Sequence, residues 1–351
     1  MTLADLGAKY DNFYAPRFVV ELDGREYDHS DGVISEVSVD TAVEKADRFE
    51  LSLEVTFDQK RGEFASLNWE QFAIGTPVEI EVGYGRNTET VLVGTIAELA
   101  PDFPANGQPS VRISGYGLQH EMGRGQRSES WDDATDSTVV EEIANQYRFT
   151  EVDVTDTDLE RPKIVQDNEN NLTFVNRLAE RNSASGGGAF EVAVRRDEFY
   201  FGPARDRSEP QLSLGYGEAL VSFSPEYTTG SQVAEVEVWG WDADGKTEVT
   251  GTSDRDGPWS GTEVLRRPVD STAEAEEAAA ARLKEIAEDR LSGRGETIGL
   301  PELHAGEIIE LVRLGDRFTG PYYVESATHR VNSDGYATTF DVRLPDEEVL
   351  E

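Results

Sequence analysis

The sequence predicts a mainly β protein of the α+β class. It contains two similar antiparallel β-domains, an α/β domain between them and a long helix inserted in the second β-domain. Three observations support this fold: one strand pattern occurs near both ends, helical apolar spacing is concentrated in the middle, and an Ala- and Glu-rich segment interrupts the second set of strands. We place the domains at residues 1–119, 120–230 and 231–351.

The repeated strand pattern is the strongest of these observations. It returns about 230 positions later, a distance too long for a solenoid repeat of about 20 to 50 residues. The corresponding segments are Gly75 with 78–82 and Gly306 with 309–311, then 91–95 and 322–326, then 110–113 and 339–342. Duplication of a small β-domain lets three chains around an axis present six similar domains.

The first domain has alternating and β-branched runs separated by turn signals such as Asp23-Gly24 and Asn106-Gly107. The expected strands are 18–22, 33–43, 49–57, 77–83, 90–98 and 110–114. Around 63–72 the apolar spacing predicts a short helix. This number of strands in about 100 residues favours a small barrel or sandwich.

The middle domain has two amphipathic patterns. Thr135 to Thr138 can cap a helix with an apolar stripe at Val140, Ile143, Ala144 and Tyr147. Asn170 or Asn171 can cap a second helix, whose buried face contains Phe174, Val175, Leu178 and Ala179. After the glycines at 186–188, a hairpin of 190–194 and 198–202 completes the α/β domain.

The second β-domain is expected to open near Val233 with a strand at 235–239 and a turn at Asp244-Gly245. Ser271 and Glu274 have capping-box spacing, so we predict an inserted helix at about 272–291. Strands resume after it at 295–299, 307–313, 321–331 and 337–344.

The chain is strongly acidic. It has 70 Asp and Glu against 32 Lys and Arg, a formal net charge of −38 spread over the whole length. Molar salt shortens the Debye length to about 3 Å and screens such self-repulsion, so we expect a halophilic source. The same charge disfavours a dedicated nucleic-acid site and an anionic membrane surface.

Cysteine is absent, which excludes disulfides and thiolate metal sites. The amino-terminal residues lack a basic start followed by an apolar run, and no stretch of about 18 apolar residues occurs. We therefore expect no membrane span, with assembly in the cytoplasm before any export as part of a larger particle.

No residue pattern indicates catalysis, a cofactor or a metal. His29, His120, His304 and His329 are far apart in sequence and none lies in an H-E-x-x-H arrangement. The segments 242–245 and 254–257 resemble the start of a calcium loop but lack its bidentate Glu, so we interpret them as turns. Our expected catalytic, cofactor and metal sites are none.

Several segments together resemble the late control D and VgrG-like baseplate hub proteins of contractile phage tails and contractile injection systems. They are Tyr14 to Phe18, Gln166 to Asn168 with Asn171 to Arg181, and Gly306-Glu307 through Gly320 to Val324 and on to His329. Each motif is loose, but together they cover nearly the whole chain in order.

This resemblance implies a structural homotrimer in which two tube-like β-barrels per chain form a pseudo-sixfold ring. The ring would join a hexameric inner tube protein to a trimeric spike and would contact other baseplate subunits. The chain stops soon after Leu344, so the spike is expected to be a separate protein. The finished particle would be a virion or an extracellular injection device.

Two alternative functions stay open at this point. One is a cell-wall hydrolase carried on such a particle, which needs a cleft with two carboxylates of separated pKa. The other is a secreted β-rich binding module, which the missing signal sequence disfavours. The residues before Arg17 and after Leu344 are predicted to be docking arms, because chain ends can reach neighbouring proteins.

Overall fold

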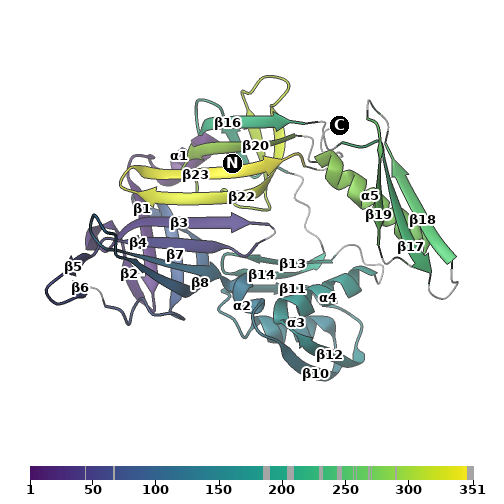
Figure 1. Cartoon of the computed structure of the whole chain (residues 1–351), viewed down its shortest axis with the longest axis horizontal. Helices are drawn as coiled ribbons and strands as arrows, with labels where there is room; N and C mark the ends of the chain where they lie inside the picture. The colour runs from purple at the N-terminus through teal and green to yellow at the C-terminus, as the bar shows by residue number, and fades with distance from the viewer. Residues whose placement is uncertain are drawn as a thin grey trace.

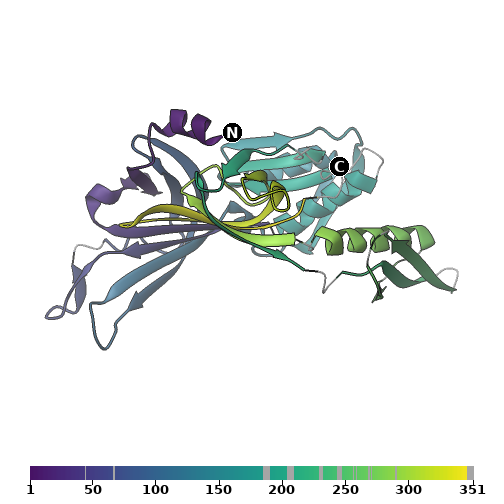
Figure 2. The same cartoon turned by 90° about the horizontal axis from the view of Figure 1, so that it is seen from above.

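The computed structural model describes residues 1–43, 45–65, 68–184, 190–203, 209–228, 232–242, 247–255, 257, 259–267, 269, 271–288 and 291–345. It confirms the mainly β, α+β class. One large sheet contains strands from both ends of the chain, and an α/β unit and a small helix-covered sheet extend from it (Figures 1 and 2).

We call the strands β3, β4, β7, β8 and β9 the first set. They pair in the order β3-β4-β9-β8-β7, and β1 and β2 extend the sheet beyond β7. The bounds are β1 Pro16–Leu22, β2 Arg25–Tyr27, β3 Ile34–Ala42, β4 Arg48–Leu53, β7 Pro77–Tyr84, β8 Asn87–Asp102 and β9 Ser110–Gly117.

The second set contains β16, β20, β21, β22 and β23. They pair in the order β16-β20-β23-β22-β21, and β15 adds to β21 in parallel. The bounds are β15 Leu212–Gly215, β16 Leu220–Tyr227, β20 Leu291–Ile298, β21 Ile308–Val312, β22 Gly320–Asn332 and β23 Gly335–Arg343. Because β22 also pairs with β3, the two sets form one continuous sheet.

A single hydrophobic core lies beneath both sets. Phe18, Phe49 and Ile80 from the first half and Leu311 and Phe340 from the second half belong to the same buried cluster. Period-two alternation of apolar and polar residues in β4, β7 and β23 turns one side chain in two toward this core.

The α/β unit between the sets confirms the predicted helices and hairpin. Thr135 caps α3 through its hydroxyl, which accepts from the Thr138 N–H, and Asn170 likewise accepts from the Thr173 N–H at the start of α4. The elements are α2 Leu118–Met122, β10 Arg127–Ala134, α3 Asp136–Ala144, β11 Glu151–Val154, β12 Arg161–Glu169, α4 Asn171–Ala184, β13 Phe190–Arg195 and β14 Glu198–Pro203.

The strand predicted to open the second β-domain is in a different sheet. β17 (Glu235–Asp242) pairs with β18 (Thr247–Asp254) and β19 (Thr262–Arg266), and α5 (Thr272–Glu288) packs on these strands. The alanine stripe of α5 provides the reason: Ala275 and Ala279 are fully buried against this sheet. The inserted helix is confirmed, but its sheet is separate from the main one.

Two strands of the main sheet come before the expected boundary at residue 230. β15 and β16 pair with β21 and β20, whereas the sequence placed their residues in the α/β domain. The division at residues 119 and 230 and the closure of each set into a barrel stay predictions.

The predicted short helix at 63–72 is wrong for its described residues. Residues 63–65 form β6 (Glu63–Ala65), paired with β5 (Thr56–Asp58). Asp58 accepts from the N–H groups of Lys60 and Arg61 in the turn, and Phe57 packs against Phe64 at 5.1 Å between ring centroids. Cross-strand aromatic packing therefore outweighs the helical spacing.

The amino terminus forms a helix that the sequence analysis missed. α1 (Leu3–Tyr10) is capped by Thr2 and buries Leu6 and Tyr10 in the main core. Lys9 and Tyr10 both contact the Glu302 carboxylate, at 3.0 and 2.8 Å. The amino-terminal segment up to Tyr10 is thus packed on the chain's own second half. A short 3₁₀ turn, η1 (His29–Asp31), precedes β3.

Gly115 in β9 provides a test of this core. A Cβ atom there would lie 2.1 Å from the Thr95 carbonyl oxygen and 2.5 Å from the Phe49 ring. We expect Gly115→Ala to lower the free energy of unfolding by about 1 to 3 kcal/mol through overpacking, measured by urea unfolding in molar salt. Gly7→Ala in α1, where a Cβ meets nothing within 4 Å, is the control. Equal stability of the two variants would contradict the packing described here.

Candidate functional site

The candidate site is the seam, by which we mean the pairing of β3 with β22 where the two sets meet. The register runs from Val37 opposite Val331 to Ala42 opposite Ser326. The Val43 N–H continues it by donating to the Glu325 carbonyl at 3.1 Å. Val37, Val39 and Val331 are fully buried along the seam. It is therefore an interior junction that bonds one half of the chain to the other.

Matching hydrogen bonds precede strand β7 of the first set and strand β21 of the second set. The Gly75 N–H donates to Ile96 and the Ile96 N–H to Thr76, at 2.8 and 3.0 Å. In the second set the Gly306 N–H donates to Val324 and the Val324 N–H to Glu307, at 2.8 and 2.9 Å. Gly75 and Gly306 both have positive φ angles, 92° and 84°, a conformation that favours glycine.

Two further strand-end bonds also occur in both sets. Gly117 donates to Asp47 as Leu344 donates to Leu291, and Glu54 donates to Val33 as Ile298 donates to Ala219. These bonds fix which residues correspond between β9 and β23, β4 and β20, and β3 and β16. The predicted repeat is thus confirmed as a repeat of strand order and of hydrogen bonding.

Two β-bulges occupy the same places in both sets, while the bulge at Val91 of β8, opposite β7, has no counterpart in the described pairing of β21 with β22. β3 is bulged at Ser35 and β16 at Val221, while β8 is bulged at Ala97 and β22 at Glu325. A bulge is a specific local feature that two sheets do not acquire by strand propensity alone. The two sets are therefore copies of one architecture.

The bulges also correct part of the repeat read from the sequence. Ala97 aligns with Glu325, so the segment 91–95 corresponds to 319–323, three residues before the predicted match. The reason lies in the hairpins. Glu79 pairs with Val93 and its counterpart Glu310 pairs with Pro321. The hairpin segment from Glu79 to Val93 is therefore three residues longer than the segment from Glu310 to Pro321. Gly117 aligns with Leu344, so the segment 110–113 corresponds to 337–340, two residues before the predicted 339–342.

Polar groups are buried beneath the seam. His329 faces Val39 across it, and its Nδ1 lies 3.1 Å from the Thr338 hydroxyl and 2.9 Å from the Tyr336 hydroxyl. Burial lowers the pKa of His329 to about 3 and holds the pKa of His304 well below its usual range. Both imidazoles are neutral, which avoids a buried charge at the junction.

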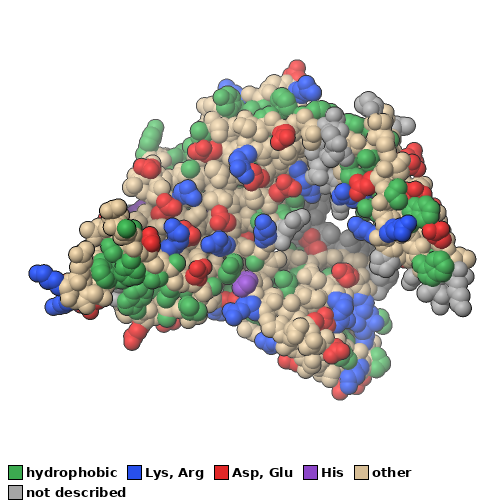
Figure 3. All heavy atoms as spheres, viewed as in Figure 1, with side chains coloured by type: hydrophobic (Ala, Val, Ile, Leu, Met, Phe, Trp, Pro, Cys, Tyr) green, Lys and Arg blue, Asp and Glu red, His purple; other side chains and the backbone are tan. Residues whose placement is uncertain are grey.

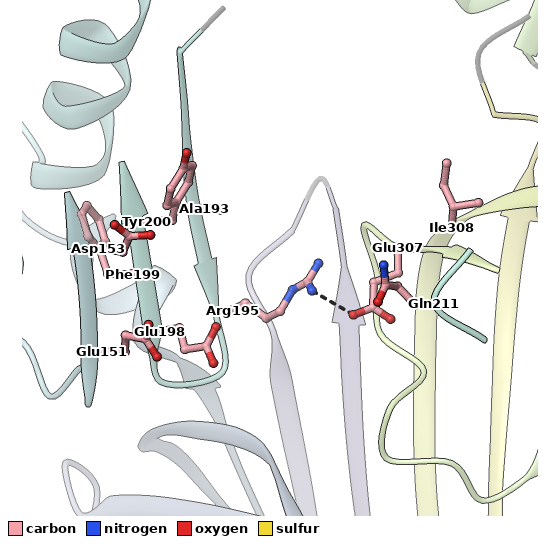
Figure 4. A pocket seen from close by; sticks show the side chains of 10 residues that line it. All are labelled: Glu151, Asp153, Ala193, Arg195, Glu198, Phe199, Tyr200, Gln211, Glu307 and Ile308. Carbon is pink, nitrogen blue, oxygen red and sulfur yellow. Dashed lines mark hydrogen bonds and ion pairs between the residues drawn. The ribbon is translucent and has the colours of Figure 1, made fainter. Parts of the chain in front are cut away.

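The α/β unit contacts the seam region through the turn between β13 and β14. Arg195 Nη1 lies 2.8 Å from Glu307 Oε1, and Arg196 donates to the Pro301 carbonyl at 2.9 Å. Beside the Arg195–Glu307 pair is a cavity of 240 Å³ between the β11-β14-β13 sheet and β21, in which Arg195 reaches across to Glu307 (Figure 4). This ion pair joins two units of the chain.

A partly buried carboxyl also lies near Arg195. Asp47, in the loop after β3, lines a second cavity with Arg195 and His304. Burial is the largest effect on its carboxyl and raises its pKa to about 7, although the Ala42 N–H and the two arginines act in the opposite direction. The loop after β3, the turn before β21 and the β13–β14 turn therefore meet in one partly charged cluster.

The structure places the four histidines in different surroundings. His29 is exposed and His120 stacks on Tyr116 at 4.2 Å. His304 and His329 are brought close enough that His329 contributes to lowering the pKa of His304. Among the described residues no group of three or more His, Cys, Asp or Glu is arranged to hold a metal ion. The turn at 243–246 and the glycines at 186–188 lie outside the described residues.

The Arg195–Glu307 pair yields a first prediction for this region. Arg195→Ala leaves the buried Glu307 carboxylate without its cation, so we expect the free energy of unfolding to fall by about 1 to 2 kcal/mol. Adding Glu307→Gln removes the uncompensated charge and should restore part of this loss. Urea unfolding of both single variants and the double variant measures the coupling, and strictly additive effects would refute an energetic link.

Asp47 predicts a pH dependence. Its folded-state pKa of about 7 lies above the ordinary value of 3.8. A carboxyl of this kind favours the folded state when protonated, so its contribution is lost as the pH rises from 3.8 through 7. We expect Asp47→Asn to raise the free energy of unfolding at pH 8 by at least about 1 kcal/mol and to change it little at pH 4. Exposed Asp132→Asn is the control, and an equal effect of Asp47→Asn at both pH values would contradict the prediction.

Known structures share this fold. The prophage MuSo2 43 kDa tail protein from Shewanella oneidensis superposes with a TM-score of 0.68 at 10% identity, covering 93% of this chain and 97% of that one. A tail protein from Neisseria meningitidis MC58 gives 0.65 at 12% identity, with 94% and 97% covered. The E. coli c3393 protein, a component of the type VI secretion system, gives 0.53 at 14% identity, with 94% and 77% covered.

At these identities the similarity establishes the fold, and the fold of this chain is that of phage tail proteins. No curated protein matches the sequence. The sequence does match one family, described as the Alg8 N-terminal domain, over residues 14–333. This range includes the first strand set, the seam, the α/β unit, α5 and all strands of the second set except β23. The chain therefore belongs to the Alg8 N-terminal domain family.

Proposed function

We propose that this chain is the hub protein of the baseplate of a contractile tail or contractile injection system. Three copies form a ring with pseudo-sixfold symmetry that joins a hexameric inner tube to a trimeric spike. One observation carries the proposal: the chain contains two strand sets with the same order and two matching bulges, bonded edge to edge through the seam. The shared fold with phage tail proteins supports it.

Such a ring can join a sixfold partner to a threefold one because some parts of each chain occur twice and others occur once. Each chain contributes two strand sets, so three chains present six similar sheets to a sixfold tube. The α/β unit, α1 and the α5 sheet each occur once per chain, so the ring presents three of each. A threefold spike can bind these single-copy features or the threefold differences between the two sets.

The seam gives the ring its mechanical role. Its hydrogen bonds and the single core beneath it bind the two sets of a chain into one rigid body. A force applied by a contracting sheath at one face then passes to the spike without separating the two halves. We propose structural transmission rather than catalysis as the mechanism.

The proposed partners are a second and third copy of this chain, the inner tube protein, the spike and other baseplate subunits. Within the described residues no helix has both the length and the apolar character to cross a membrane. We propose assembly in the cytoplasm, followed by incorporation into a virion or an injection particle.

The ring predicts a salt-dependent oligomer. Three copies carry three times the net charge of −38, and this repulsion is screened only where the Debye length is short, about 3 Å at 1 M salt. We expect trimers in molar salt and dissociation on dialysis into dilute buffer, measured by analytical ultracentrifugation. Circular dichroism in both buffers separates dissociation from unfolding. A folded monomer at every salt concentration, with no trimer even at high protein concentration, would refute the hub proposal.

A further inference from the structure

Both strand sets have the two edges from which a seam is made, but within the described residues only one pair of these edges is joined. In the seam, β3 of the first set pairs with β22 of the second. The counterpart of β3 is β16, and the counterpart of β22 is β8, as the matching bulges and strand-end bonds establish. In the described part of the chain, residues 222–227 of β16 pair only with β20, and residues 98–102 of β8 pair only with β9.

The edges of β16 and β8 are exposed where their counterparts are buried. Val39 and Thr41 on β3 and Val331 on β22 are almost completely buried. Tyr227, the counterpart of Thr41, is 45% exposed, and Phe103, the counterpart of Val331, is 58% exposed. Both edges thus leave aromatic surface in water at the positions that the seam covers.

We propose that the β16 edge of one chain pairs antiparallel with residues 99–103 at the β8 edge of the next chain, in the register of the seam. This inference rests on the proposed ring and names the residues that close it. Transferring the seam register through the matched bulges gives five opposed pairs. They are Phe223 with Phe103, Ser224 with Asp102, Pro225 with Pro101, Glu226 with Ala100 and Tyr227 with Leu99.

The partner is a second copy of this chain because the two edges are complementary to each other and not to themselves. Each edge belongs to a different strand set, so the contact is head-to-tail and generates a ring if its rotation closes. The seam already joins the corresponding two edges once within each chain. Three chains then alternate three seams within chains with three between them.

The two prolines support this register. Val43 donates toward β22, so alternate residues back along β3, including Thr41 and Val39, turn their N–H groups toward the seam. Pro225 is the counterpart of Val39 and Pro101 that of His329, so both missing N–H groups fall on one opposed pair. Each proline removes one hydrogen bond, so two are lost in either case; this register places both losses on one opposed pair, whereas a shifted register spreads them over two pairs.

Aromatic side chains next to the β8 edge extend the proposed contact. Phe103 packs against Phe57 and Phe64, at 5.3 and 5.6 Å between ring centroids, and Trp69 packs on Phe64. Apolar side chains gather on the molecular surface around β5 and β6 (Figure 3). In the proposed register, Phe223 of the neighbouring chain would lie opposite Phe103 and adjoin this cluster.

The charges at the two edges differ from those at the seam. Across the seam Arg330 lies 3.6 Å from Glu36. Their counterparts are Asp102 and Ser222, and Glu98 and Glu226 add further negative charge to the edges. Contact between chains thus brings the like charges of Glu226, Glu98 and Asp102 into neighbouring diagonal positions, so this junction should depend on salt more than the seam does.

Pairs of introduced cysteines test the proposed register. The chain has no cysteine of its own, so no native thiol can form a competing disulfide. Glu226 and Ala100 form a pair without mutual hydrogen bonds in the proposed register, where Cα atoms are about 4.5 Å apart and a disulfide fits. We expect Glu226→Cys with Ala100→Cys to give covalent trimers on oxidation in molar salt, reversed by reductant on a denaturing gel.

Two matched variants serve as controls. Asp40→Cys with Thr328→Cys occupies the corresponding pair in the seam and should link within one chain, leaving monomers on the gel. Glu226→Cys with Asp102→Cys is displaced by two residues, beyond disulfide reach, and should not link.

The outcomes separate this inference from the hub proposal. A trimer in molar salt that links through Asp40 and Thr328 within chains, but not through Glu226 and Ala100 between chains, overturns the edge pairing and leaves the ring. A protein that is always monomeric overturns both. As a second measurement, Asp102→Arg restores the charge of Arg330 and should lower the salt concentration at which half the trimers dissociate; an unchanged or higher midpoint counts against the pairing.

Discussion

The structure depends on the hydrogen-bonded seam between β3 and β22. Backbone N–H and C=O groups at a sheet edge are costly to leave unpaired in an interior. The seam satisfies them and places one core beneath both strand sets. It also fixes the rotation from one set to the next, because a bonded register allows no sliding. Any larger symmetric assembly built from these sets inherits that rotation.

Charge is the second constraint on this molecule. A net charge of −38 opposes compaction. The ionised side chains at the seam, such as Arg330 and Glu36, remain partly exposed to solvent. His304 and His329 are buried in neutral form, and the raised pKa of Asp47 shows the cost of burying a carboxylate nearby. Arg195 and Arg196 supply positive charge at the β13–β14 turn, where the α/β unit contacts the main sheet.

Local sequence signals were sufficient where an element's partners are near in sequence. Thr135 before α3, Asn170 before α4 and Ser271 before α5 cap the predicted helices. Local signals did not predict the correct element where contacts between residues distant in sequence decide whether a segment becomes a helix or a strand. The segment 63–65 became a strand through contact with Phe57, and residues 3–10 became a helix that buries Tyr10 against the second half. β17 likewise joined the sheet under α5, because that helix needs an apolar surface to cover.

The sequence by itself determined that two similar strand sets exist, because alternating apolar residues and the glycines at 75 and 306 encode strands and turns locally. Only the tertiary structure decided that β3 pairs with β22, that β15 and β16 complete the second set, and that Arg195 meets Glu307. The physical reason is that a strand edge presents the same backbone groups whatever its sequence. The choice of partner therefore depends on which edges the whole chain brings together.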